Sequence, residues 1–423
     1  MLTRALLMAV PLLLASTPAS AHAAGQPIAR MAADFAAAQR ITMGEGARVA
    51  IVGDAVANAR ALNGAVRGRL DLVKWPRATM LYGTAQATML AASGPRPGAP
   101  TATRGLVPEV ELLSVRVEPF LADFGSNRTK HNRWYERNRG VLFLSSGIRW
   151  AANHGADVIW TTTSWEGGDT RLAEAVAYAA GKGAVVVAPA WPAPRSWGIG
   201  VNGVYDPHGL PGVIGVGVVD LNGSRLEEYS AKNRSVLLSA PGLPLPTTGP
   251  RGQRYYLDSG TAASGWVVAA AAMVKAKYPK LAPSLVIQAL AATARRPGQQ
   301  GDGAGEDVIT AAYRTSEPRA YDTSIGFGLV NPAGALKMAG RLAAMKPGKD
   351  SVAPGARFGG GIPTQKIVAV RHDKTGLTGM AGAIGGGGLL LSLASVAIVR
   401  GRRTPNANIE AAVRNQAGSP PRP

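Results

Sequence analysis

The sequence predicts an α/β protein in which helices cover a mostly parallel β-sheet. Short runs of β-branched residues alternate with alanine-rich stretches of helical spacing, the pattern of strand and helix units that build such a sheet. The chain has 423 residues, 46% of them hydrophobic, which is enough for a large core. No internal repeat interrupts this alternation, so we expect a doubly covered sheet rather than a repeat array.

The predicted elements follow one another in a simple order. Strands are predicted at 48–52, 111–117, 157–160, 183–188 and 212–219. Helices are predicted at 145–154 and 170–181, where apolar residues recur with helical spacing. A further helix of small residues is predicted after Asp258, ending near Pro279.

Both ends of the chain carry targeting signals. Residues 1–23 combine Arg4, an apolar run and the small-residue end Ala21-His22-Ala23, the form of a secretory signal peptide. Residues 377–399 carry no charge, are long enough to cross a bilayer, and are followed directly by Arg400. Positive residues favour the cytoplasmic side, so we expect a single-pass cell-membrane protein with its N-terminal domain outside. The alternative for 377–399 is a buried core helix.

These signals divide the chain into six predicted segments. They are a signal peptide (1–23), an N-terminal extension (24–44), a folded domain (45–344), a Pro/Gly-rich linker (345–376), a transmembrane helix (377–399) and a basic cytoplasmic tail (400–423). The sequence leaves open whether the extension is a propeptide or stays attached.

Composition limits the chemistry. The absence of cysteine excludes a cysteine nucleophile and a thiolate zinc site, and we expect no cofactor and no metal in the site. The sequence leaves open whether metal ions support the loops. The net charge of +20 is spread along the chain without a nucleic-acid motif, so no nucleic-acid partner is predicted. The densest basic cluster is interpreted as a solvated insertion, with an envelope-binding patch as the alternative; it contains Arg128, Lys130, Arg133, Arg137 and Arg139.

Several segments match, in order, the motifs of one enzyme family. They are 105–117, 148–159, 210–219, 239–242, the helix that follows Asp258, and 326–333. The chain therefore resembles the subtilisin-like serine proteases (subtilases, peptidase S8) over about residues 45–340. The resemblance implies a three-layer subtilisin-like fold. The exported domain, spacer, membrane helix and basic tail also resemble the layout of mycosins, the membrane-anchored proteases of type VII secretion.

At the catalytic positions of that family, this chain carries residues of other chemical types or carries them out of register. The family aspartate matches Asp54 one place late, with Gly53 as the ungapped match, and Tyr82 stands at the histidine position. The nucleophilic serine falls on Thr261, or on Ala262 with a one-residue gap. At the oxyanion asparagine the chain has Trp191 and Pro192, with Pro192 as the matched position. Neither carries an amide side chain.

No other residue is predicted to restore the centre. Tyrosine is not a base near neutral pH. His131, His154, His208 and His372 all lie away from positions that the chemistry uses. The alternative interpretations of the matched hydroxyl and carboxylate are structural: Thr261 caps a helix N-terminus, and Asp54 accepts backbone N–H groups where a helix begins at position 55.

The sequence therefore predicts a degenerate subtilase. We expect a membrane-anchored pseudoprotease that binds an extended peptide or secreted protein, or serves as a scaffold, at the cell surface as part of a secretion assembly. One alternative is an active endopeptidase with a non-standard centre, in which Thr261 is the nucleophile. The other is a basic module that binds the cell envelope.

Overall fold

The computed structural model describes residues 27–345, apart from 75–77, 96–103, 121–122, 124–126, 128, 131–139, 166–168, 194–199, 201, 244 and 298–320. By its internal contacts the chain divides into residues 1–362 and 363–423, and all of the second unit lies outside the described residues. The predicted signal peptide, membrane helix and tail, and all but the first residue of the predicted linker, also lie outside them. No helix in the described ranges is both long and apolar enough to span a membrane.

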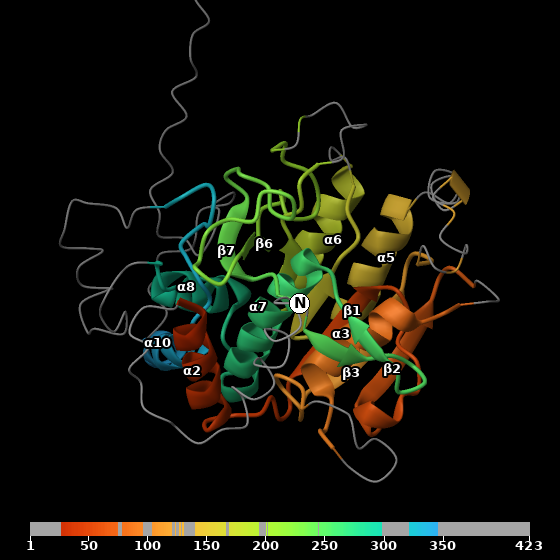
Figure 1. Ribbon diagram of the computed structural model, residues 1–423, viewed down its shortest axis with the longest axis horizontal. Coiled ribbons are helices and arrows are strands. Elements are labelled where there is room, and N and C mark those ends of the chain that lie inside the picture. Colours follow the sequence, from red (N-terminus) through yellow and green to blue (C-terminus); the bar gives the residue numbers. More distant parts are fainter. Residues whose placement is uncertain are drawn as a thin grey trace, which may run out of the picture. The chain divides into compact units, whose positions relative to one another are not determined.

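A parallel sheet forms the centre of the first unit (Figure 1). Among the described residues, seven strands pair in the order β2-β3-β1-β4-β5-β6-β7. The strands are β1 Arg48–Gly53, β2 Val66–Asp71, β3 Glu111–Arg116, β4 Val158–Thr161, β5 Val185–Pro189, β6 Val213–Val219 and β7 Val236–Pro241. A separate antiparallel pair joins β8 Pro246–Thr248 to β9 Arg254–Tyr256. Each predicted strand is present, whereas β2, β7 and the β8–β9 hairpin were not predicted.

Helices cover both faces of the sheet, as the sequence predicts. They are α2 Pro27–Gln39, α3 Leu81–Ala91, α5 Gly140–Asn153, α6 Thr170–Gly181, α7 Ser259–Lys277, α8 Pro283–Thr293 and α10 Pro332–Ala344, with a short 3₁₀ turn η3 at Arg60–Leu62. The predicted helix at 145–154 begins five residues early, at Gly140, while 170–181 is matched by α6.

The alternation of side chains along β1 divides the core in two. Val49 and Ile51 belong to the cluster that includes α3, α7, α8 and α10, whereas Ala50 and Val52 belong to the cluster that includes α5 and α6. Successive residues of a strand point to opposite faces, so one strand contributes to both layers. The fold is therefore a helix–sheet–helix sandwich of the expected class.

Helix α7 lies deep in the larger layer. Its residues are buried around almost the whole circumference, from Gly260 to Lys275, which only small side chains allow at such close packing. Near its first turns, the Ser264 hydroxyl accepts a hydrogen bond of 2.9 Å from the Trp160 indole N–H of β4. This bond holds the start of α7 against the centre of the sheet.

The helix of the N-terminal extension packs onto the same layer. In α2, Phe35 is fully buried and meets the ring of Trp266 edge-on, with 4.7 Å between the centroids. Its neighbour Asp34 accepts hydrogen bonds from the Arg295 guanidinium at 2.5 and 2.8 Å. In this structure α2 therefore contributes to the core of the domain.

Candidate functional site

The predicted site residues come from the segments that follow parallel strands and from two helix N-termini. Asp54 follows β1, and Trp191 and Pro192 follow β5. Tyr82 lies in the first turn of α3, and Thr261 in the first turn of α7. The carboxyl ends of parallel strands share one edge of a sheet, and ligands of open α/β sheets bind outside that edge.

The structure brings Tyr82 and Thr261 together and adds a residue that the sequence reasoning missed. The Tyr82 hydroxyl donates to Asp258 Oδ2 and contacts Thr261 Oγ1. Thr261 Oγ1 also donates to Asp258 Oδ2 at 3.0 Å, and its N–H donates to Asp258 Oδ1 at 2.9 Å. Asp258, rather than Thr261, is the N-cap of α7, so the interpretation of Thr261 as the helix cap was wrong. The signal for Asp258 was a carboxylate three residues before the matched hydroxyl.

Tyr82 and Thr261 are shielded from solvent in this cluster, whereas Asp258 is exposed. Thr261 is fully buried, and the Tyr82 side chain is packed flat against Phe120, with 4.8 Å between the ring centroids and 13° between their planes. Burial, followed by the negative charge of Asp258, raises the pKa of Tyr82 well above its ordinary value. The phenol therefore stays protonated near neutral pH. It acts as a hydrogen-bond donor rather than as a base.

Asp54 faces a different partner. Its Oδ1 accepts the Ala55 N–H at 2.8 Å and its Oδ2 the Gly83 N–H at 3.3 Å, and its carboxylate lies 3.8 Å from Arg116 Nε. Arg116 is fully buried and is also bound to Asp123 at 2.8 Å. None of the hydrogen bonds found for Asp54 in the described residues reaches the Tyr82 hydroxyl.

The carboxylate of Asp54 is accordingly held by backbone N–H groups and a buried cation. Burial raises its pKa to about 6, although the N–H groups of Gly83 and Ala55 act in the opposite direction. No helix begins at Ala55, where the chain runs as a loop toward η3, so that part of the capping interpretation was wrong. Its other part, that the carboxylate accepts backbone donors, agrees with the hydrogen bond from Ala55.

The segment after β5 covers the N-terminus of α7. A Cβ atom added at Gly260 would lie 1.7 Å from Trp191 Nε1, so the indole rests directly on the backbone of the first turn. The Tyr205 hydroxyl donates to the Trp191 carbonyl at 2.6 Å and supports this segment. Pro192, at the predicted oxyanion position, has neither an N–H nor a side-chain amide to donate.

The histidines that the structure describes lie outside this cluster. His208 is buried, and neither of its ring nitrogens has a hydrogen-bond partner among the described residues. Burial lowers its pKa to about 3, so the ring is neutral at physiological pH. His154 is exposed at the end of α5, where it stacks on Trp150. His131 and His372 lie outside the described residues.

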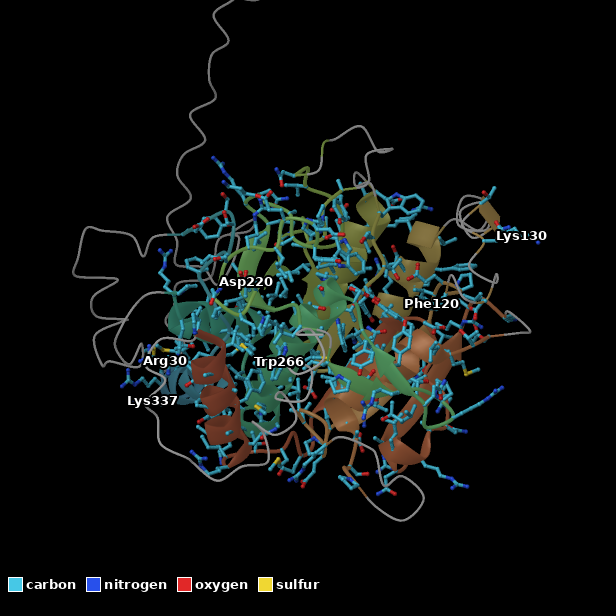
Figure 2. All side chains as sticks on the ribbon, in the orientation of Figure 1. Arg30, Phe120, Lys130, Asp220, Trp266 and Lys337 are labelled. Atoms are coloured by element: carbon cyan, nitrogen blue, oxygen red, sulfur yellow. The ribbon has the colours of Figure 1, made fainter. Side chains whose placement is uncertain are left out.

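Of the basic cluster, Lys130 is exposed, and the other members lie outside the described residues (Figure 2). In the part of the chain that the structure describes, no group of three or more His, Cys, Asp or Glu residues is arranged to hold a metal ion.

Comparison with known families decides the classification. Residues 82–328, more than half of the chain, match the family model described as Peptidase_S8, the subtilase family. The chain belongs to the subtilase family. The match begins at the histidine position Tyr82 and ends in the closing glycine motif at Gly328, so it spans the predicted order of motifs.

Known relatives include both secreted subtilisins and mycosins. Subtilisin DY of Bacillus licheniformis is 33% identical over 201 residues, which is 47% of this chain and 66% of the relative. Mycosin-5 of Mycobacterium tuberculosis is 28% identical over 283 residues, or 56% of this chain and 44% of the relative. The chain thus spans about half to two thirds of the length of these relatives.

Solved structures agree with this kinship. The crystal structure of MycP1 with its N-terminal propeptide removed is 25% identical, with a TM-score of 0.52, and the match covers 71% of this chain and 95% of that one. The periplasmic assembly from the ESX-5 inner membrane complex contains a chain of the same fold, at 24% identity and a TM-score of 0.57, over 80% of this chain and 90% of that one. This subtilase therefore has mycosins among its relatives and its structural neighbours.

Proposed function

We propose that this subtilase homologue is a pseudoprotease, anchored in the cell membrane, that binds an extended peptide or acts as a scaffold at the outer face. One observation carries the proposal. The Tyr82 hydroxyl, which stands at the histidine position, donates to Asp258 and contacts Thr261, so it is not free to accept a proton.

The chemistry of acyl transfer supports inactivity. A serine-type centre needs a base for the nucleophile, a carboxylate to orient that base, and donors for the oxyanion. Tyr82 is a protonated donor, Asp54 is held by Arg116 and backbone N–H groups, and Pro192 has no N–H. Thr261 is also fully buried, so a scissile carbonyl has no route to its hydroxyl without movement of neighbouring groups.

The binding role is supported by what the fold retains. Losing the reactive groups leaves the sheet and its helices intact, because function in such folds depends on the site rather than on the scaffold. The subtilase scaffold holds peptides in extended form, a mode in which backbone hydrogen bonds supply much of the affinity. Kinship with mycosins favours a secreted protein or a component of a type VII secretion assembly as the partner. The predicted helix at 377–399 provides the anchor.

Inactivity is tested with the full-length chain in detergent. The protein is treated with a fluorophosphonate probe and assayed for casein cleavage, beside an active subtilisin and a Thr261→Ala variant. We expect neither labelling nor cleavage above that variant from protein shown to be folded by circular dichroism. Labelling that disappears in Thr261→Ala would overturn the proposal.

Peptide binding needs a separate measurement. The detergent-solubilised chain is immobilised and exposed to secreted proteins of the source cells and to unfolded casein as a generic extended chain. Saturable binding that a competing extended peptide displaces is the expected result. The absence of saturable binding to any of them would remove the peptide role and leave the scaffold role.

A second candidate, an endopeptidase with an unusual centre, is favoured by one contact. Thr261 Oγ1 lies 3.0 Å from Asp258 Oδ2, within reach of proton transfer to a carboxylate. In this alternative Thr261 is the nucleophile and Asp258 the base. Cleavage that is lost in both Thr261→Ala and Asp258→Asn, but retained in an Asp54→Asn variant, would establish it.

A further inference from the structure

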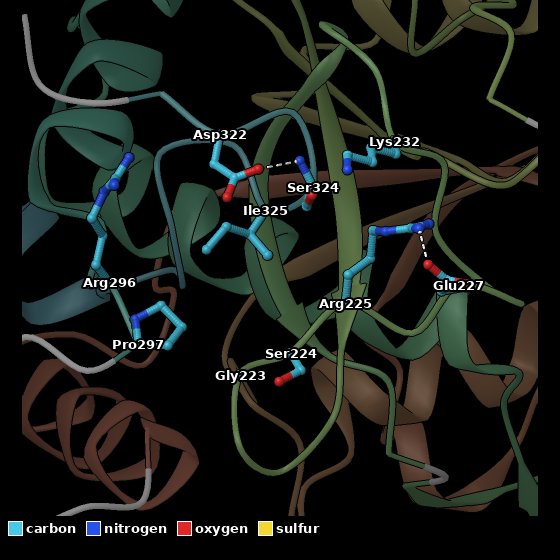
Figure 3. Close-up of a pocket in the computed structure, with 10 residues that line it drawn as sticks. All are labelled: Gly223, Ser224, Arg225, Glu227, Lys232, Arg296, Pro297, Asp322, Ser324 and Ile325. Atoms are coloured by element: carbon cyan, nitrogen blue, oxygen red, sulfur yellow. Dashed lines mark hydrogen bonds and ion pairs between the residues drawn. The ribbon is translucent and has the colours of Figure 1, made fainter.

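A polar pocket lies away from the predicted centre. It has a volume of about 440 Å³ and is formed by the loop after β6, the segment after α8 and the segment around residues 322–325 (Figure 3). Arg296 stands on one side of it, and Arg225 and Lys232 stand on the other. None of the pocket residues belongs to the Tyr82 cluster.

Part of the charge in this pocket is already neutralised within the protein. Arg225 donates to the Ser230 carbonyl at 2.6 Å and to Glu227 at 2.5 Å. The Asp322 carboxylate accepts the Ser324 N–H at 2.6 Å. These groups shape the wall of the pocket and have their main hydrogen bonds satisfied.

Two cations remain without an acceptor among the described residues. The Nε and Nη2 atoms of Arg296 are buried and have no hydrogen-bond partner there, and the exposed Lys232 ammonium has no acceptor there either. Burying guanidinium nitrogens without a partner is costly, because they lose water and gain nothing in return. An acceptor group that enters the pocket would recover that cost once a movement of the neighbouring groups or of the Arg296 side chain uncovers these atoms.

We propose that this pocket is a binding site for a carboxylate carried by a peptide or protein partner. Arg225, Lys232 and Arg296 contribute three positive charges and Glu227 and Asp322 two negative ones, so the pocket has a net charge of +1 that matches a monoanion. A guanidinium fork suits the two oxygens of a carboxylate. The acidic residues at the wall oppose a doubly charged phosphate by like-charge repulsion. The volume also leaves room for the residue that carries the carboxylate.

This inference does not depend on whether the centre around Tyr82 is active. The carboxylate comes either from an Asp or Glu side chain or from a chain terminus. Both sources present the same chemistry to Arg296, so the probes used in the test must separate them.

The test uses the full-length chain in detergent, labelled with ¹⁵N so that arginine Nε–H signals can be followed. The probes are acetyl-Ala-Asp-Ala-amide, its Asn counterpart, acetyl-Ala-Ala-Ala with a free C-terminus, and inorganic phosphate. The variants are Arg296→Ala and, because Lys232 is exposed and its loss spares the fold, Lys232→Ala. Lys280→Ala removes an equal charge from an exposed site before α8, at the other end of that helix from Arg296.

We expect the aspartyl or the C-terminal probe to shift the Arg296 signal saturably, and the stronger of the two identifies the source. Followed through the Arg225 Nε–H signal, which every variant keeps, binding should weaken about tenfold in Lys232→Ala, vanish in Arg296→Ala and stay unchanged in Lys280→Ala. Equal binding of the Asn probe, unchanged binding in Lys232→Ala and Arg296→Ala, or preferential binding of phosphate would each overturn the carboxylate assignment.

Discussion

Replacing Tyr82 by phenylalanine removes the hydroxyl that bonds to Asp258 and contacts Thr261, and keeps the ring that stacks on Phe120. The lost interaction is a hydrogen bond to a carboxylate, which contributes about 1.5–3 kcal/mol in folded proteins. Asp258 is exposed, so water replaces part of the lost bond. The remaining partners are not orphaned, because the Thr261 hydroxyl and N–H still bond to Asp258 at 3.0 and 2.9 Å. We therefore expect a loss of about 1–2 kcal/mol in the free energy of unfolding.

Urea unfolding followed by tryptophan fluorescence measures this loss. Thr261→Val serves as the matched variant, because it removes the other hydroxyl of the same carboxylate while keeping the shape of the side chain. In the double variant, the loss of free energy of unfolding should differ from the sum of the losses in the two single variants, since both hydroxyls bond to Asp258. A Tyr82→Phe variant within about 0.5 kcal/mol of the parent, and additive with Thr261→Val, would refute the cluster as a source of stability.

Three further outcomes follow from the structure. Gly260→Ala, which would normally stabilise a helix by about 1 kcal/mol, should instead destabilise the protein because the new methyl group meets Trp191; in a Trp191→Ala background this penalty should disappear, and equal effects in both backgrounds would contradict the contact. For Asp54, whose folded pKa is raised to about 6 from an ordinary value near 3.8, the native state holds the proton more tightly than the unfolded state, so the free energy of unfolding should fall by about 2 kcal/mol between pH 4 and pH 6.5; an Asp54→Asn variant with the same pH profile would exclude this carboxyl as the cause. Phe35→Ala, which opens a cavity beside Trp266, should cost about 3–5 kcal/mol in urea unfolding, and a cost below 1 kcal/mol would mean that α2 is not an integral part of the core.

The fold class and the family were accessible from the sequence because both depend on local, repeated patterns. Buried parallel strands read as β-branched runs, and α6 shows its apolar spacing over 170–181 directly. Strand β2 was missed because its side chains alternate between half-buried and exposed at the sheet edge, and Arg67, Arg69 and Asp71 dilute the apolar signal. The β8–β9 hairpin was missed because three-residue strands are too short to show a period.

By itself, the sequence determined which chemical groups the centre has and which it lacks, since Tyr82, Thr261 and Pro192 are matters of residue identity. Only the tertiary structure decided which other side chains those groups contact. The Tyr82 hydroxyl and the Asp258 carboxylate are separated by 176 residues and come together because α3 and α7 pack side by side on the same face of the sheet. The pairing of Asp54 with Arg116 likewise depends on β1 and β3 being adjacent. Burial and hydrogen-bond partners are set by such long-range packing, and they determine whether a carboxylate or a phenol is available for chemistry.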